Sequence, residues 1–386
     1  MTIADGVSRE PSETAARPSP RSSRPRILIF AAEVGGGHQA AGKALLSRLH
    51  QAGYDGVVID GLHLLSPALD WMMRPGYTAQ LVYAPDSLDL VFQVFTNRLT
   101  APVVRRTLGG LFGHRLLHEI NRYQPDLIVT AFPMTTSALG ELLRDGRLRV
   151  PVVAIVSDFG VHRLWTHPVI PLHLLPSHAS AEIARGFGVK AVAVKFPTGP
   201  RFHDLPSREA ARRELGIPED CFVTLITGGT WGVGNLAKTA ELCLMAARTA
   251  VIPVKTIIVC GKNALLEDHL SDRFGAEPRV SVLGWTSKLP LLMRASDCLI
   301  QNAGGMTCLE AIETNLPIIF HNPIPGHGAW NAEVMVKAGA AYWPGSDDNL
   351  TRLLEGAIRG DQPLKRPAAA PDLLDPIPLI RKMLDE

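Results

Sequence analysis

Residues 26–53 read RILIFAAEVGGGHQAAGKALLSRLHQAG, and this stretch decides the class of fold. Apart from its leading arginine, the run at 26–32 is apolar and rich in isoleucine, which predicts a short buried strand. The glycines at 35–37 then permit a tight turn, and the residues after them carry the apolar spacing of a helix. A strand, a glycine turn and a helix in this order form the repeating unit of a doubly wound α/β fold.

The same alternation continues along the rest of the chain. Apolar runs that predict strands recur at 56–60, 126–132, 150–159 and 173–177, and then at 221–229, 254–261, 279–285, 297–305 and 316–323. Because most of these runs are apolar throughout, we expect parallel sheets covered by helices on both faces. Between the two groups the chain reads FPTGPR at 196–201, and its two prolines and glycine indicate a boundary between domains.

The chain therefore predicts two Rossmann-like doubly wound domains, one at 25–199 and one at 200–360. Residues 1–24 are rich in Ser, Pro, Arg and Ala and lack the apolar core of a signal peptide, so we expect a disordered tail there. Residues 361–386 begin as a second Pro- and Ala-rich tail, and their last ten residues, IPLIRKMLDE, have the pattern of a terminal helix.

Composition limits the partners and the compartment. Of the 386 residues 46% are hydrophobic and 20% charged, and the net charge of +2 gives no sign of a nucleic-acid partner. Charge or proline interrupts every apolar stretch before about 18 residues, so no membrane-spanning helix is expected. The five cysteines include no CxxC pair and lie mostly in apolar runs, which indicates buried thiols in a reducing cytoplasm. The thirteen histidines show no HExxH spacing, so no metal site is expected.

The first candidate site is the turn at 35–37 with His38 beside it. The N–H groups and the dipole of a helix N-terminus favour a negative group, and His38 would stand at the mouth of that site. Tight glycine turns also occur in any doubly wound fold, so a purely structural role stays open. Residues 37–44, GHQAAGKA, come close to a phosphate-binding loop, but Ala44 replaces the hydroxyl residue that ligates Mg²⁺, which disfavours an NTPase.

Two further glycine turns lie in the second half. Residues 227–234, TGGTWGVG, follow a predicted strand and precede a predicted helix, but no GxGxxG with a suitably placed acidic residue is present, so a nicotinamide cofactor is poorly supported. Residues 302–311, NAGGMTCLEA, start a helix after a buried strand, which supplies free N–H groups for a phosphate. Glu310 lies in the first turns of that helix, where its carboxylate can bind ribose hydroxyls or simply complement the helix dipole.

Five segments together resemble the family of monogalactosyldiacylglycerol synthases and processive diacylglycerol glucosyltransferases, which is related to the lipid II N-acetylglucosaminyltransferase. They are AAEVGGGHQAAGKAL (31–45), SDFGVHRLW (157–165), LITGGTWGVG (225–234), VLGWTSKLPLLMRASDCLIQNAGGMTCLEAI (282–312) and NLPIIFHNPIPGHGAWNA (315–332), in the order of the family. The resemblance spans about residues 26–360. Plant-type members have Lys at position 302 and Gly-Pro-Gly at 304–306, so the identity of the sugar stays open.

The resemblance implies the GT-B fold, with a lipid acceptor on the N-terminal domain and a UDP-sugar on the C-terminal domain. It also implies inversion at the anomeric carbon without a metal or other cofactor. It gives His38 and Asp158 as catalytic candidates, either of which can be the base. Its acceptor-side residues are Gly36, Gly37, His162 and Trp165, and its donor-binding residues are Gly229, Thr230, Gly284, Trp285, Gly305, Met306, Thr307, Glu310, His327 and Asn331.

The expected activity is that of an inverting, UDP-sugar-dependent hexosyltransferase that moves a hexose or N-acetylhexosamine to a lipid hydroxyl, with diacylglycerol favoured, in glycolipid synthesis. A UDP-sugar 2-epimerase, a transferase with a soluble acceptor and a non-catalytic nucleotide-sugar sensor stay open as alternatives.

The segment at 63–124 supports the lipid acceptor, because it combines many aromatic residues with Arg74, Arg98, Arg105, Arg106, Arg115 and Arg122. It predicts a peripheral contact with an anionic membrane, on the inner face of the plasma membrane. The alternative is an ordinary amphipathic helix that packs on its own sheet.

Overall fold

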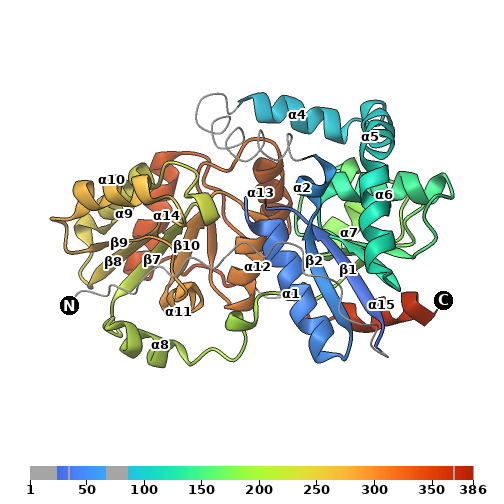
Figure 1. Cartoon of the computed structure of the whole chain (residues 1–386). Coiled ribbons are helices and arrows are strands. Elements are labelled where there is room, and N and C mark those ends of the chain that lie inside the picture. The colour runs from blue at the N-terminus through green and yellow to red at the C-terminus, as the bar shows by residue number, and fades with distance from the viewer. Residues whose placement is uncertain (1–23, 34, 67–85, 368–369, 386) are drawn as a thin grey trace.

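The computed structural model describes residues 24–33, 35–66, 86–367 and 370–385, which form two α/β domains side by side (Figure 1). The tail expected at 1–24 lies outside these residues, except for its last residue. The part of the basic, aromatic segment at 67–85, with Arg74, also lies outside them. As the apolar runs predict, each domain is built on one parallel sheet.

The first sheet has six strands in the order β2-β1-β3-β4-β5-β6. Helices cover both faces, because alternate residues of β1 pack on different helices: Ile27 and Ile29 share a core with α1, whereas Leu28 and Phe30 share one with α5 and α6. The strands are β1 (Arg26–Ala31), β2 (Asp55–Asp60), β3 (Leu127–Thr130), β4 (Val152–Ile155), β5 (Leu172–Leu175) and β6 (Ala191–Ala193). The helices are α1 (Gly37–Gln51), α2 (Gly61–Leu65), α4 (Asp86–Thr96), α5 (Thr100–Tyr123), α6 (Pro133–Arg144) and α7 (His178–Arg185).

The second sheet has five strands in the order β11-β10-β7-β8-β9. These are β7 (Phe222–Thr227), β8 (Val254–Val259), β9 (Val280–Leu283), β10 (Cys298–Gln301) and β11 (Ile318–Phe320). The helices around the sheet are α8 (Arg208–Leu215), α9 (Leu236–Ala246), α10 (Ala264–Phe274), α11 (Leu289–Ala295), α12 (Gly305–Glu313), α13 (His327–Lys337) and α14 (Asp347–Arg359). All five cysteines are buried free thiols, as their apolar surroundings predict.

The carboxyl ends of the strands set the position of the site. In parallel α/β sheets ligands bind beyond these ends, where neighbouring strands connect in opposite directions. In the first sheet this point lies between β1 and β3, and in the second between β7 and β10. α1 follows β1 directly, α12 follows β10, and the two helices pack on each other across the domain boundary (Figure 1).

The C-terminal residues return to the first domain, which the sequence pattern did not reveal. Helix α15 (Pro376–Asp385) buries Ile380 in a core that includes residues of the first sheet, and Arg381 Nε donates to Tyr54 Oη at 3.0 Å. In Figure 1 it lies below β1 and β2, away from the rest of the second domain. Just before α15, Leu374 pairs in parallel with Val194 at the end of β6, so the returning chain joins the first sheet close to where the outgoing chain leaves it.

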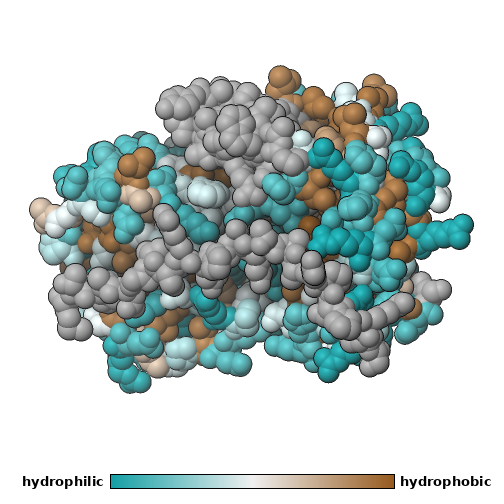
Figure 2. Space-filling model, viewed as in Figure 1, coloured by the Kyte–Doolittle hydropathy of each residue, from teal (hydrophilic) through white to brown (hydrophobic). Residues whose placement is uncertain are grey.

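In the described part of the chain, no helix is both long and apolar enough to cross a membrane. Helices α4 and α5 and the turn between them nevertheless expose large apolar side chains to solvent, with Leu99 at 73% and Val103 at 61% exposure. Figure 2 shows hydrophobic residues gathered at the top of the view, where Figure 1 places these two helices.

Candidate active site

Three helix N-termini meet at the boundary between the domains. α1 begins at Gly37, α12 at Gly305 and α13 at His327, and no side chain caps any of the three. Their first backbone N–H groups therefore have no partner within the helix or from a cap. A Cβ on Gly37 would lie 3.6 Å from Met306 Cγ, so α1 and α12 almost touch. Such termini stabilise phosphate and other negative groups.

The domains approach each other closely at two glycines. Gly36 has a φ of 80°, and a Cβ there would overlap Oγ1 of Thr230 in the second domain. A Cβ on Gly305 would overlap the carbonyl oxygen of Ser157 in the first domain. Both contacts cross the boundary, so a larger residue at either position would hold the domains apart. The structure thus places acceptor-side Gly36 against donor-side Thr230.

His38 lies at the centre of this boundary. Its half-buried ring is 5.3 Å from each of the rings of Phe132 and Trp165, and its Nδ1 has no hydrogen-bond partner among the described residues. Burial lowers the pKa of His38 below its usual 6.5, and the charge of Asp158 only partly opposes this. The ring is therefore neutral at pH 7, which is the form that accepts a proton.

Asp158 lies in the loop after β4, and its carboxylate is held at both oxygens. Trp165 Nε1 donates to Oδ2 at 3.0 Å, and Asn331 Nδ2, from the second domain, donates to Oδ1 at 3.3 Å. The side chain is only 8% exposed. This negative charge raises the pKa of His38 and of His327 against the effect of burial. The arrangement can therefore stabilise a positive charge that forms on a neighbouring imidazole.

His162 forms an aromatic wall of the site. Its ring lies 5.6 Å from Phe92, 5.9 Å from Phe95 and 6.2 Å from Trp165. Burial lowers the pKa of His162 to about 3, so it stays neutral. The two phenylalanines belong to α4, which lies over the boundary in Figure 1. The sequence shows these two residues only as part of an aromatic, arginine-rich segment, and their spacing of three residues, typical of one helix face, is the one signal that could have found them.

Donor-side Glu310 lies in the second turn of α12. Burial raises the pKa of its carboxyl to about 8. A half-buried carboxyl with a raised pKa is typical of a functional site, because ordinary surface carboxylates stay ionised at pH 7. Thr307, one turn earlier, is half-buried.

The turn at Gly229 and Thr230 lies between a strand and a helix, as its sequence predicts. After β7 the chain forms a short 3₁₀ turn over Gly229–Trp231, and α9 begins only at Leu236, with Asn235 as its side-chain cap. The turn is instead fixed by the backbone N–H of Lys262, which donates to the carbonyl of Thr230 at 2.7 Å.

Gly284 and Trp285 lie apart from the other candidates. They follow β9, the edge strand, which β7 and β8 separate from β10. The Trp285 ring is 64% exposed, with Lys262 Nζ 5.2 Å from its centre. An exposed aromatic ring beside a cation offers a flat surface on which a base can stack.

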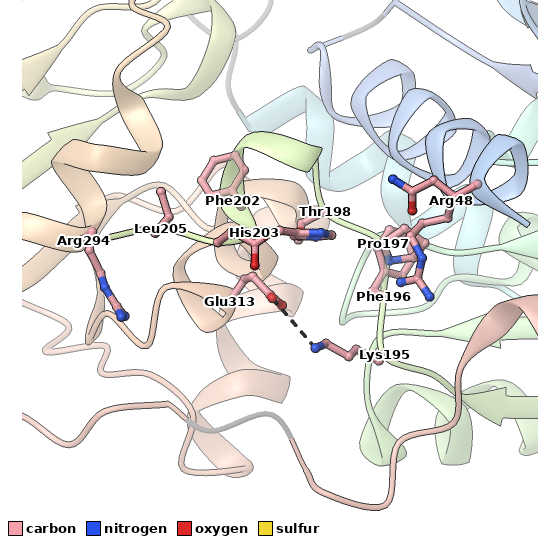
Figure 3. Close-up of a pocket in the computed structure, with 12 residues that line it drawn as sticks. Arg48, Lys195, Phe196, Pro197, Thr198, Phe202, His203, Leu205, Arg294 and Glu313 are labelled. Carbon is pink, nitrogen blue, oxygen red and sulfur yellow. Dashed lines mark hydrogen bonds and ion pairs between the residues drawn. The ribbon is translucent and has the colours of Figure 1, made fainter. Parts of the chain in front are cut away.

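A hollow of about 490 Å³ lies at the crossing between the domains, away from these residues (Figure 3). Arg48, Lys195, Phe202, Arg294 and Glu313 are among its lining residues, and Lys195 Nζ lies 3.9 Å from Glu313 Oε1. None of the candidate catalytic or binding residues lines it. Across the described ranges, no three His, Cys, Asp or Glu side chains cluster in a way that could hold a metal ion.

Comparisons with known proteins agree with this architecture. The family model described as monogalactosyldiacylglycerol (MGDG) synthase matches residues 38–200, and the glycosyltransferase family 28 C-terminal domain matches residues 223–369. A processive diacylglycerol beta-glucosyltransferase from Bacillus pumilus is 25% identical over 350 residues, which cover 88% of each chain. The enzyme of the same name from Bacillus subtilis is also 25% identical, over 88% of this chain and 89% of its own.

Solved structures share the fold at lower identity. MurG from Acinetobacter baumannii has a TM-score of 0.55 at 16% identity, covering 93% of this chain and 99% of its own. Anabaena Alr3699/HepE, solved with UDP-glucose, has a TM-score of 0.52 at 17% identity, covering 93% and 98%. The expected GT-B fold and the resemblance of the five sequence segments are thereby confirmed. The chain belongs to the glycosyltransferases that join a monogalactosyldiacylglycerol synthase domain to a glycosyltransferase family 28 C-terminal domain.

Proposed function

We propose that this enzyme transfers a hexose or N-acetylhexosamine from a UDP-sugar to a lipid hydroxyl, with diacylglycerol as the acceptor. The observation that carries the proposal is the neutral, partly buried His38 beside the fixed carboxylate of Asp158, where three uncapped helix N-termini meet. The names of the two Bacillus relatives support the lipid acceptor, and the UDP-glucose complex of the Anabaena protein supports the donor class.

In the proposed reaction His38 takes the proton of the acceptor hydroxyl while the hydroxyl oxygen attacks the anomeric carbon. The new carbon–oxygen bond forms as the bond from that carbon to the diphosphate breaks, which inverts the configuration. Asp158 stabilises the imidazolium, and the N-termini of α12 and α13 receive the negative charge that builds on the departing UDP. We propose that no metal takes part in this step.

Donor binding divides among the remaining candidates. Glu310 would accept hydrogen bonds from the ribose hydroxyls, and Gly284 with Trp285 would frame the uracil. Gly305, Met306 and Thr307 would present backbone and hydroxyl donors to the diphosphate, with Gly229 and Thr230 across from them. His327, at the start of α13, would reach the sugar or the phosphate.

The enzyme would reach its acceptor by docking α4 and α5 on a membrane. Leu90, Leu99, Val103 and Leu111 are each more than half exposed there. Exposed Arg98 and Arg106 lie among them and suit anionic headgroups. Two other arginines of this segment have structural roles instead: buried Arg105 donates to the carbonyl of Thr166 at 2.7 Å, and Arg115 to that of Leu65 at 3.0 Å.

The double variant Leu99→Asp with Val103→Asp should bind vesicles of anionic phospholipid at least roughly 10-fold more weakly, because each apolar side chain contributes about 1.5–3 kcal/mol when fully buried. Vesicle co-sedimentation measures this directly. The matched control is Val251→Asp, at a valine that is 97% exposed in the second domain. Equal binding by the double variant, the control and the unaltered enzyme would exclude this surface as the docking site.

A UDP-release screen tests the function itself. Several UDP-sugars are each incubated with diacylglycerol, ceramide and soluble aglycones, and we expect release above background only with a lipid acceptor. Turnover only with a soluble aglycone would overturn the lipid assignment. Conversion of UDP-N-acetylglucosamine without any acceptor would indicate an epimerase, and no turnover with any pair would favour a sensor.

A further inference from the structure

Asn331 has every polar atom of its side chain engaged within the protein. Its Oδ1 accepts the backbone N–H of Gly160 at 2.8 Å. Its Nδ2 donates to the carbonyl of Ala303 at 3.0 Å and to Oδ1 of Asp158 at 3.3 Å. The residue is fully buried. It therefore does not contact a sugar or phosphate in this arrangement, in contrast to the role that the family resemblance implies.

These hydrogen bonds join the two domains. Asn331 and Ala303 belong to the second domain, whereas Gly160 and Asp158 lie in the loop after β4 of the first. A buried amide with three good partners has one preferred position, because any displacement leaves a buried donor or acceptor unpaired at a cost of about 1–3 kcal/mol. The Asp158 carboxylate therefore depends on a residue that reaches it only when the domains meet.

Trp330, the residue before Asn331, packs on the same loop after β4. A Cβ on Gly160 would lie 2.7 Å from Trp330 Cγ, so the ring and the glycine backbone are in tight contact. The ring also meets Phe92 of α4, with the ring centres 5.3 Å apart and the planes at 89°. The start of α13 thus packs both on the loop after β4 that holds Asp158 and Gly160, here called the catalytic loop, and on α4, which we assign to the acceptor side.

We propose that Asn331 is a positioning residue that holds the Asp158 carboxylate in its working orientation beside His38, and that it does so through closure of the donor domain on the acceptor domain. The proposal rests on the proposed function, in which His38 is the base. It links donor binding to chemistry, because a domain that has not closed leaves Asp158 without one of its two side-chain donors.

The charged groups around His38 predict the direction in which its pKa should change when Asn331 is replaced. The titratable groups that act on it are Asp158 from the loop after β4, His162 from the same loop and His327 from α13. Burial lowers the pKa of both neighbouring histidines, so they are neutral near pH 7 and Asp158 supplies the charge. That charge raises the pKa of His38. A loosened Asp158 must therefore lower the pKa of His38 further.

The test compares Asn331→Ala with Asp158→Asn and with Met335→Ala. Met335 is fully buried in the same helix but makes no hydrogen bond to the catalytic loop, so it controls for lost stability. For Asn331→Ala we expect kcat to fall about 10- to 100-fold with the donor KM changed less than about threefold. The acid limb of the kcat/KM profile should move to lower pH, as in Asp158→Asn. Met335→Ala should lower the rate equally at every pH.

NMR titration of the His38 ring gives a readout that does not depend on turnover. The resonance is assigned with His38→Gln, and its midpoint should fall in Asn331→Ala but not in Met335→Ala. An unmoved midpoint would overturn the proposal even if the enzyme were inactive. So would a raised donor KM at unchanged kcat, because Asn331 would then bind the donor directly. Failure of the unaltered enzyme to release UDP would count against the proposed function alone.

Discussion

His38→Ala is expected to lower kcat for sugar transfer by about 10²- to 10⁴-fold, the range that a positioned general base contributes. The imidazole is neutral because burial lowers its pKa, so it can take the proton of the acceptor hydroxyl at pH 7. The ring packs between Phe132 and Trp165 of the first domain, so its removal leaves the proposed donor contacts of α12 in place. We therefore expect the Kd for UDP to change by less than about threefold.

Steady-state rates with saturating UDP-sugar and calorimetric titration with UDP measure the two quantities. The control is His63→Ala, which removes an exposed histidine from α2 of the same domain and should leave both unchanged. An equal loss of UDP affinity and of turnover in His38→Ala would show that the residue belongs to the donor site. Retention of turnover would transfer the role of base to Asp158.

Glu310→Gln is expected to weaken UDP binding by about 10- to 100-fold, because a ribose hydroxyl left without its acceptor in a buried site costs about 1–3 kcal/mol. The isosteric amide keeps the packing of α12 but exchanges an acceptor oxygen for a donor, which the ribose hydroxyls cannot satisfy in the same way. Calorimetric titration with UDP gives the affinity. Glu313→Gln, three residues on in the same helix, removes the carboxylate that pairs with Lys195 and should bind UDP normally.

The same variant should make the free protein more stable. Burial raises the pKa of Glu310 from 4.5 to about 8, so the unfolded chain is ionised between these values while the folded protein holds the proton. The contribution of Glu310 to the free energy of unfolding is thus fully present below pH 4.5 and is lost progressively as pH rises to about 8. Glu310→Gln escapes this loss, and we expect a gain on the order of 2 kcal/mol at pH 8 that vanishes near pH 4. Denaturant unfolding at both pH values measures it. A variant less stable than the unaltered protein at pH 8 would contradict the functional reading of this carboxyl.

The sequence predicted the two sheets because their inner strands are apolar on both faces, which leaves continuous runs such as residues 26–32. It missed β6, whose three residues, Ala191–Ala193, are too short to form a pattern. Residues near the start of helices that follow strands, such as His38 and Glu310, could be proposed as site residues because strand ends in this fold meet at one edge. The order of strand, glycine turn and helix along the chain was enough to propose them.

Other features depend on contacts between residues far apart in the chain. The hydrogen bond from Gly160 to Asn331 joins positions 171 residues apart, and nothing local distinguishes an asparagine that bridges domains from one that binds a ligand. Arg105 could not be separated from the exposed arginines around it, although it is buried and its pKa falls to about 10. The packing of Phe92 on Trp330 likewise exists only because α4 and α13 meet across the boundary.

The outgoing chain leaves the first domain close to the place where the returning chain rejoins it, which would restrict how the two domains can separate. A single flexible connection would let the domains twist and slide, whereas the pairing of Val194 with Leu374 ties both crossings to the first domain at one place. A rotation about this place would separate the two domains at the opposite edge of their boundary, whereas twisting and sliding would strain the pairing. His38 lies in the first domain and Asn331 in the second, away from the paired residues. Such a rotation would therefore admit substrates between the domains and return the two residues to the same relative position each time the domains close.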